Sequence, residues 1–199
     1  SSAFAGCTGL GSVRTPTSLT SLGSSVFNGC TGLVEAEVNG TSLDLSRTYS
    51  PFSNCGSLRR ISFGEGVTAL PTSSDSYDGP FAGCVALGEV FVGSAVTAIP
   101  TAFLSGNSSN SKPHPGKVSF AGVITKVGYR AIPCSSVTNL EIRLGAGCTV
   151  DAYAFSGCSA IMPGGENFPQ IASVGERAFE NCRNIKGGLD LRLAQSVGQ

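Results

Sequence analysis

The chain has 199 residues, with 13 basic and 13 acidic side chains and a formal net charge of zero. This balance provides no basic surface for nucleic acid and no polybasic surface for a membrane. No apolar run approaches the roughly 18 residues needed to span a bilayer, so we expect no membrane span. Composition therefore excludes the nucleic-acid-binding and membrane-spanning classes of protein.

A short motif, Phe-x-x-Cys, recurs along the whole chain. Two further positions fit it in part: Phe103, which has Gly106 in place of the Cys, and Ile132, whose nearby Cys134 lies one place early. Repetition at a spacing between 22 residues (81 to 103) and 29 residues (52 to 81) is typical of a solenoid, in which each repeat forms one coil. The six complete copies are Phe4/Cys7, Phe27/Cys30, Phe52/Cys55, Phe81/Cys84, Phe155/Cys158 and Phe179/Cys182.

Alternating apolar residues follow each motif and predict one short strand per coil. The polar stretches 73–79 and 105–116 carry the extra residues of the longer repeats, and we expect them to be loops. The seventh coil begins at Ile161 but runs into MPGGENFP, which weakens its strand until 171–174. In chain order, the other expected strand regions are 10–13, 33–38, 58–63, 87–92, 118–120, 137–144 and 189–193.

Such coils cannot bury their apolar sides alone, so we expect residues 1–199 to form a single solenoid of about eight stacked coils. Each Phe should fill the corner of its coil against the Phe above and below. Both ends look like cuts through a longer array, which predicts flat apolar ends covered by flanking sequence or by a docked neighbour. The expected corner residues lie near positions 4, 27, 52, 81, 103, 132, 155 and 179.

The eight cysteines allow two interpretations. They could form a secreted disulfide framework, because an even count in a short chain is typical of one. They could instead be core residues at one structural position, since their spacing follows the repeat and free Cys is often buried. Neighbouring coils would point these side chains in parallel, the wrong direction for a bond. Cys134 and Cys148 lie off this position, and they are the pair to test for a bridge.

Searches for catalytic, cofactor and metal motifs find nothing in a supporting context. The lone histidine, His114, lies in the proline-bracketed stretch KPHPG, which indicates a solvated loop. The stretch GEGVTA at 64–69 fits the dinucleotide fingerprint, but Leu70-Pro71 follows it, so no helix can begin there to bind a pyrophosphate. No C-x-x-C motif supports zinc. We expect no enzyme activity, cofactor or metal.

Function should therefore lie on the surface, on the strand residues that alternate with the core. Phe91 is the candidate anchor, because an aromatic side chain that projects from a sheet can bind a partner. An insertion packed over Phe91 or a shift of strand register would remove that role. The other charges alternate in sign, as a merely solvated face also does. The expected partner-binding face comprises Arg14, Glu37, Arg59, Arg60, Glu89, Phe91, Glu141 and Arg143.

The repeats resemble the BspA-like class of leucine-rich repeats, with units of the form Leu-x-x-Ile-x-Ile-Pro, then Val-x-x-Ile, then Ala-Phe-x-x-Cys. The resemblance implies a curved right-handed solenoid with a parallel β-sheet on its concave side and short 3₁₀ or turn segments on the convex side. It also implies a mostly non-catalytic protein on a bacterial or protist surface, where it binds proteins or matrix. The residues that carry the resemblance are 58–71 with 81–84, 87–103, 152–161 and 173–185.

Two functions follow as hypotheses. The first is a non-enzymatic module, extracellular or at the cell surface, that binds a protein or matrix partner in adhesion. The alternative is a structural subunit of a larger assembly, held by neighbouring subunits at its uncapped ends. Asn39 and Asn107 begin N-glycosylation triplets, which would be used if the chain is eukaryotic and secreted, although such triplets also arise by chance in Ser-rich sequence.

Overall fold

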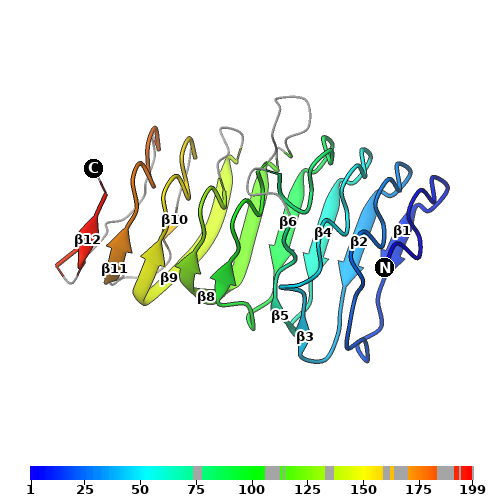
Figure 1. Ribbon diagram of the computed structural model, residues 1–199, viewed down its shortest axis with the longest axis horizontal. Coiled ribbons are helices and arrows are strands. Elements are labelled where there is room, and N and C mark those ends of the chain that lie inside the picture. The colour runs from blue at the N-terminus through cyan, green and yellow to red at the C-terminus, as the bar shows by residue number, and fades with distance from the viewer. Residues whose placement is uncertain are drawn as a thin grey trace.

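The protein is a solenoid of parallel β-strands, shown by a computed structural model (Figure 1). Successive coils stack side by side, and the two chain ends lie at opposite ends of the stack. No residue in the described ranges is helical, and the segments between the strands are turns. Accordingly, the described part of the chain offers no helix that could cross a membrane. The structure describes residues 1–73, 78–105, 113, 115–132, 137–158, 162–163, 170–182, 191–192 and 194–198.

The strands are short because each coil turns after a few extended residues. Only β8 and β9 exceed ten residues. In chain order the strands are β1 (Ser12–Arg14), β2 (Glu35–Val38), β3 (Leu43–Asp44), β4 (Arg60–Phe63), β5 (Val67–Ala69), β6 (Glu89–Val92), β7 (Ala98–Ile99), β8 (Lys117–Val127), β9 (Asn139–Val150), β10 (Met162–Pro163), β11 (Ile171–Val174) and β12 (Ser196–Val197).

These strands form two parallel columns. The first column comprises β1, β2, β4, β6, the first half of β8, the first half of β9, and β10. The second begins as the separate pair β3–β5 and continues through β7, the ends of β8 and β9, β11 and β12. Register shifts within β8 and β9 carry each strand from one column to the other, so these two strands join the columns into one sheet.

The phenylalanine corners stack as the repeat predicts. The Phe4 and Phe27 rings are stacked at 5.6 Å, the Phe27 and Phe52 rings at 5.4 Å, and the Phe155 and Phe179 rings at 5.3 Å. Backbone bonds join the corners as well: the Phe27 amide, for example, donates to the Pro51 carbonyl at 2.9 Å. The corners are therefore held together both by aromatic packing and by a ladder of backbone hydrogen bonds.

The fifth corner lies one residue later than expected. Leu104, not Phe103, donates its amide to the residue before the next corner, Ala131, in the pattern that Phe27 follows. Phe103 instead packs edge-on against Phe81, with ring centroids 5.4 Å apart. Because the motif Cys is absent here, the sequence pattern predicted that the aromatic residue, Phe103, would form the corner. The backbone places the neighbouring leucine there.

The motif cysteines are free thiols inside the stack, apart from the exposed Cys7 and the half-buried Cys182. Each one from the second copy onward donates to the carbonyl of the corner residue in the preceding coil: Cys55 to Phe27 at 3.1 Å, Cys84 to Phe52 at 3.0 Å and Cys158 to Ile132 at 3.0 Å. The core interpretation is confirmed for these residues, and the thiol also satisfies a carbonyl that faces the interior. Cys148 is likewise free and buried, in β9, whereas Cys134 lies outside the described residues.

Two of the expected strands differ in the last coils. In the seventh, β10 forms at Met162–Pro163 despite the proline and is followed by β11 where the pattern resumes. The strand predicted over 189–193 falls mostly outside the described residues, and Leu191 and Arg192, which are described, are not in a strand. The final described strand is β12, in the second column.

Candidate binding surface

The outer face of the first strand column is the candidate site, and we call it the outer sheet face. Its residues alternate with the core residues Ala36, Ile61, Val90, Val118 and Leu140, all of them buried. Parallel pairing brings equivalent residues of successive strands into two rows that run along the stack. The first row is Ser12, Glu35, Arg60, Glu89, Lys117 and Asn139; the second row is Arg14, Glu37, Ser62, Phe91, Ser119 and Glu141.

The first row is a chain of ion pairs across four strands. Arg60 contacts Glu35 at 3.4 Å and Glu89 at 2.9 Å, and Glu89 also contacts Lys117 at 3.9 Å. The hydrogen bond to Glu89 has the largest effect on the pKa of the Arg60 guanidinium, which it raises above its ordinary value. The bond to Glu35 raises it further. Opposite charges on neighbouring strands support this register, although exposed pairs contribute little to stability.

Phe91 lies in the second row between two small side chains. It pairs with Ser62 of β4 on one side and Ser119 of β8 on the other, and 40% of its surface is exposed. The Ser119 hydroxyl donates to Glu141 at 2.8 Å, a bond that lowers the pKa of the Glu141 carboxyl. The prediction that Phe91 projects outward is therefore confirmed, and the ring stands above its serine neighbours.

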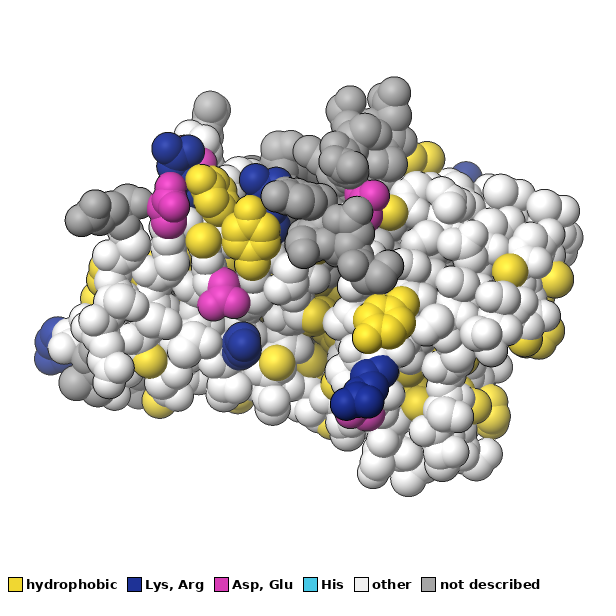
Figure 2. All heavy atoms as spheres, in the orientation of Figure 1, with side chains coloured by type: hydrophobic (Ala, Val, Ile, Leu, Met, Phe, Trp, Pro, Cys, Tyr) yellow, Lys and Arg dark blue, Asp and Glu magenta, His cyan; other side chains and the backbone are white. Residues whose placement is uncertain are grey.

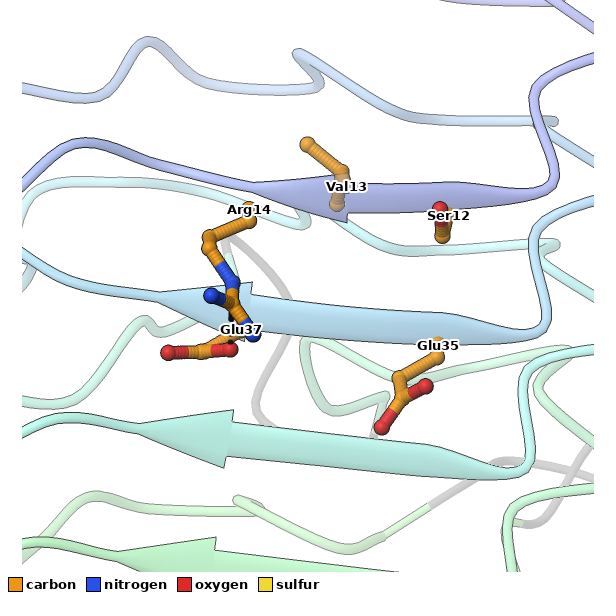
Figure 3. A pocket seen from close by; sticks show the side chains of 5 residues that line it. All are labelled: Ser12, Val13, Arg14, Glu35 and Glu37. Carbon is orange, nitrogen blue, oxygen red and sulfur yellow. Dashed lines mark ion pairs between the residues drawn. The ribbon is translucent and has the colours of Figure 1, made fainter.

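A shallow pocket opens at the first two strands of the same face (Figure 3). It has a volume of about 150 Å³ and is lined by residues of β1 and β2. Arg14 extends over β2 to contact Glu37 at 2.7 Å, whereas the Glu35 carboxylate lies on the side of β4, where it contacts Arg60 at 3.4 Å. The Glu37 carboxylate in the pocket wall is therefore already paired with an arginine.

The structure places the other predicted residues as follows. Arg59 immediately precedes β4 and is exposed, while Arg143 lies in β9 opposite Val123. Neither makes an ion pair with another described residue. The Asn39 amide donates to the Thr15 carbonyl at 3.3 Å and to Glu37 at 3.0 Å. Asn107 lies outside the described residues.

Lys117 is a charged site residue that sequence reasoning missed. The strand was expected to begin at Val118, whereas β8 begins at Lys117. The signal was present, because Glu35, Arg60 and Glu89 each stand one residue before the inward-facing residue of their strand. Within the described ranges, no three His, Cys, Asp or Glu side chains converge in a way that could hold a metal ion.

The parallel coils and the repeated Phe-x-x-Cys corner define a repeat protein of the leucine-rich solenoid class. The family model for the BspA type leucine rich repeat region matches in six copies, over residues 1–112 and 81–188. The chain therefore belongs to the BspA-type leucine-rich repeat family. No curated protein and no solved structure matches the chain.

Proposed function

We propose that the protein is a non-catalytic binding module that docks a protein or matrix partner on the outer sheet face. The observation that carries the proposal is Phe91, an aromatic ring 40% exposed at a central strand of that face. Aromatic residues ringed by polar neighbours supply a large share of binding energy at protein interfaces. The ion pairs of Arg60, Glu89 and Lys117 provide such a polar rim along one side of the ring.

Arg59 and Arg143 add positive charge to the proposed binding surface. Both are exposed cations at the border of the face, and acidic groups on a partner would match them. The family resemblance supports an adhesion role at an extracellular or cell-surface location. A glycan on Asn39, found by mass spectrometry of the protein from its native source, would support a secretory route. Finding Asn39 unmodified in that material would remove this support.

The test begins with the whole chain immobilised as bait against an extracellular-matrix preparation, followed by affinity measurement with the purified partner. Phe91→Ala should weaken binding by about thirtyfold or more, the effect of losing a central aromatic anchor. The matched control is Val85→Ala, which removes another exposed apolar side chain, 52% exposed, from a corner away from the face. Equal affinities for wild type and Phe91→Ala would refute the assignment of the outer sheet face.

The first coil favours a second candidate, a structural subunit that associates through its end. The Phe4 ring is 49% exposed, whereas its stacking neighbour Phe27 is 3% exposed. A flat aromatic surface of this kind is typical of a coil that packs against another. Light scattering should then show an assembly whose mass falls to that of a monomer in Phe4→Glu. A monomeric wild type at all concentrations would exclude this candidate.

A further inference from the structure

The charges in the first row of the outer sheet face are complementary to the same row read in reverse. The side chains of β2, β4, β6 and β8 are in turn acidic, basic, acidic and basic, so reversing their order reverses every sign. Such a row is not a general feature of the surface, because Figure 2 shows a side of the molecule on which charged side chains are few among uncharged surface. The four residues are Glu35, Arg60, Glu89 and Lys117.

The second row has opposite charges at its two ends and a ring beside a small residue at its centre. Arg14 of β1 and Glu141 of β9 are separated by five strand steps of about 4.8 Å, or roughly 24 Å. Glu141 accepts a hydrogen bond from Ser119 at 2.8 Å and makes no ion pair with another described residue. At the centre, the exposed Phe91 ring is paired in register with Ser62.

We propose that the outer sheet face binds a second copy of this chain and forms a two-fold dimer. The inference rests on the function proposed above and names the partner of that face. A two-fold axis parallel to the strands and between β4 and β6 places the two sheets face to face, with their stacks in opposite directions. In this arrangement β4 faces β6 of the second copy, β2 faces β8, and β1 faces β9.

This arrangement brings no like charges together. Arg60 faces Glu89 of the second copy, and the acidic Glu141 faces the basic Arg14. The Phe91 ring packs over a serine, which is small enough to leave room for it. Charge patterns of this kind determine which surfaces associate and in which register. The facing pairs, each present twice, are Ser12 with Asn139, Arg14 with Glu141, Glu35 with Lys117, Glu37 with Ser119, Arg60 with Glu89, and Ser62 with Phe91.

The same charges disfavour other arrangements of two copies. An axis moved onto β4 would place Arg60 against its own copy and Glu35 against Glu89, so like charges would meet. A second copy with its strands reversed would place Glu35 against Glu37 on β2. The charge pattern therefore favours one register of the dimer over these alternatives.

The competing explanation is that the charges serve only the single chain. Arg60 pairs with Glu35 and Glu89 of its own chain, and such pairs support the register of the strands. That role does not require Arg14 and Glu141 to be complementary, because a separation of roughly 24 Å greatly exceeds the screening length of about 8 Å in physiological salt. These two residues therefore distinguish a dimer interface from a set of internal pairs.

The test measures the mass of the whole chain by sedimentation velocity between about 1 and 500 µM. The face has only six short strands, so wild type should dimerise weakly, with a Kd of about 10–100 µM that rises with added salt. Arg14→Glu should raise this Kd by about tenfold or more, because acidic side chains then meet at two equivalent contacts. Glu141→Arg should do the same with basic side chains. The control is Arg47→Glu, which reverses an exposed charge after β3 and should change the Kd by less than about twofold.

Combining the two reversals gives the most specific measurement. A chain that carries both Arg14→Glu and Glu141→Arg should dimerise within about threefold of wild type, because opposite charges face each other again. A mixture of the two single variants should form a mixed dimer that is tighter than either variant alone. The Arg14 side chain is 77% exposed and Glu141 is also exposed, so the reversals should leave the fold intact, which thermal melting checks.

Three results would overturn the proposal: a wild type that is monomeric over the whole range, single reversals without effect, or a double variant as weak as the single ones. A dimer that is lost in Phe4→Glu and kept in Arg14→Glu would show association through the first coil instead. If wild type is monomeric and Phe91→Ala still weakens binding to the matrix partner, the second copy is the wrong partner and the outer sheet face remains a binding surface. If the dimer forms and Phe91→Ala leaves the matrix partner bound as before, the dimer stands and the matrix role of this face fails.

Discussion

At the scale of single residues, the repeated cysteine has a second role besides filling space. Its thiol donates to a corner carbonyl of the preceding coil, for example from Cys84 to Phe52 at 3.0 Å. A valine of similar size would leave that carbonyl without a partner, and a serine would keep the donor but bury a more polar group. This combination explains why a small residue with a weak donor recurs at this position.

Thiol chemistry provides the residue-scale prediction. Burial raises the pKa of the Cys148 thiol from 9.0 to about 12 and that of Cys182 to about 11. The unfolded thiols ionise above pH 9.0 while the folded thiols keep their protons, so the free energy of unfolding should fall as pH rises from about 9 toward 12. Denaturant titrations across this range, under reducing conditions, should show a shallower fall in Cys148→Ala than in wild type.

The different exposures of the cysteine thiols predict the order in which they react. Cys7 is exposed, whereas Cys30, Cys55, Cys84 and Cys158 are buried. A thiol reagent at pH 8 should modify Cys7 before these four, which should react only on unfolding. Cys7→Ser removes the early reaction. Early reaction of Cys84 in the folded chain would contradict the packed corner.

At the scale of the strand, the sequence predicted the first column well because period-two alternation is a local signal. It placed Phe91 outward and Ile61 inward, and both positions are confirmed. The join between the columns was not predicted, since the irregularities inside β8 and β9 depend on pairing between coils. The cluster of Tyr129, Arg130, Tyr153 and Arg177 was also missed. Aligning the residue two places before each corner would have revealed it, with Ser25 and Ser50 in early coils against Arg130 and Tyr153 in later ones.

Close packing between coils leads to a prediction at Gly66. A Cβ atom added there would overlap the carbonyl oxygen of Gly40 in the preceding coil, which is backbone and cannot move aside. Gly66→Ala should therefore lower the free energy of unfolding by about 1–3 kcal/mol, as overpacking does. The control is Gly56→Ala, where an added Cβ meets nothing within 4 Å. Urea denaturation should place that control within about 0.5 kcal/mol of wild type.

At the scale of the whole molecule, stability is distributed along the stack as a sum of coils and the interfaces between them. The coils differ in how far their corners are covered, because Phe52 is 0% exposed whereas Phe4 is 49% exposed. Hydrogen exchange should therefore be faster in residues 1–22 than in 52–92. Uniform protection along the chain would show that the end coils are as stable as the centre.

The difference in burial between Phe52 and Phe4 also predicts how much stability is lost when each ring is removed. Phe52→Ala creates a cavity between two other rings and should cost about 3–5 kcal/mol. Phe4→Ala removes a ring that is half in solvent, so it should cost no more than about 1.5 kcal/mol. Paired urea titrations compare the two variants. Equal losses would mean that the first corner is covered in solution, as the structural-subunit candidate requires.

The direction of the backbone hydrogen bonds has a mechanical consequence. In the strand columns and at the corners alike, backbone hydrogen bonds join each coil to its neighbours, along the length of the stack. A force that pulls on the two ends would therefore act parallel to these hydrogen bonds. The coils would detach one at a time, because the force would not load many hydrogen bonds in shear at once. Each peeled coil of about 25 residues would add roughly 80–90 Å of extended chain. Anchored at both ends, such a protein would lengthen in steps under load and rewind when the load is removed.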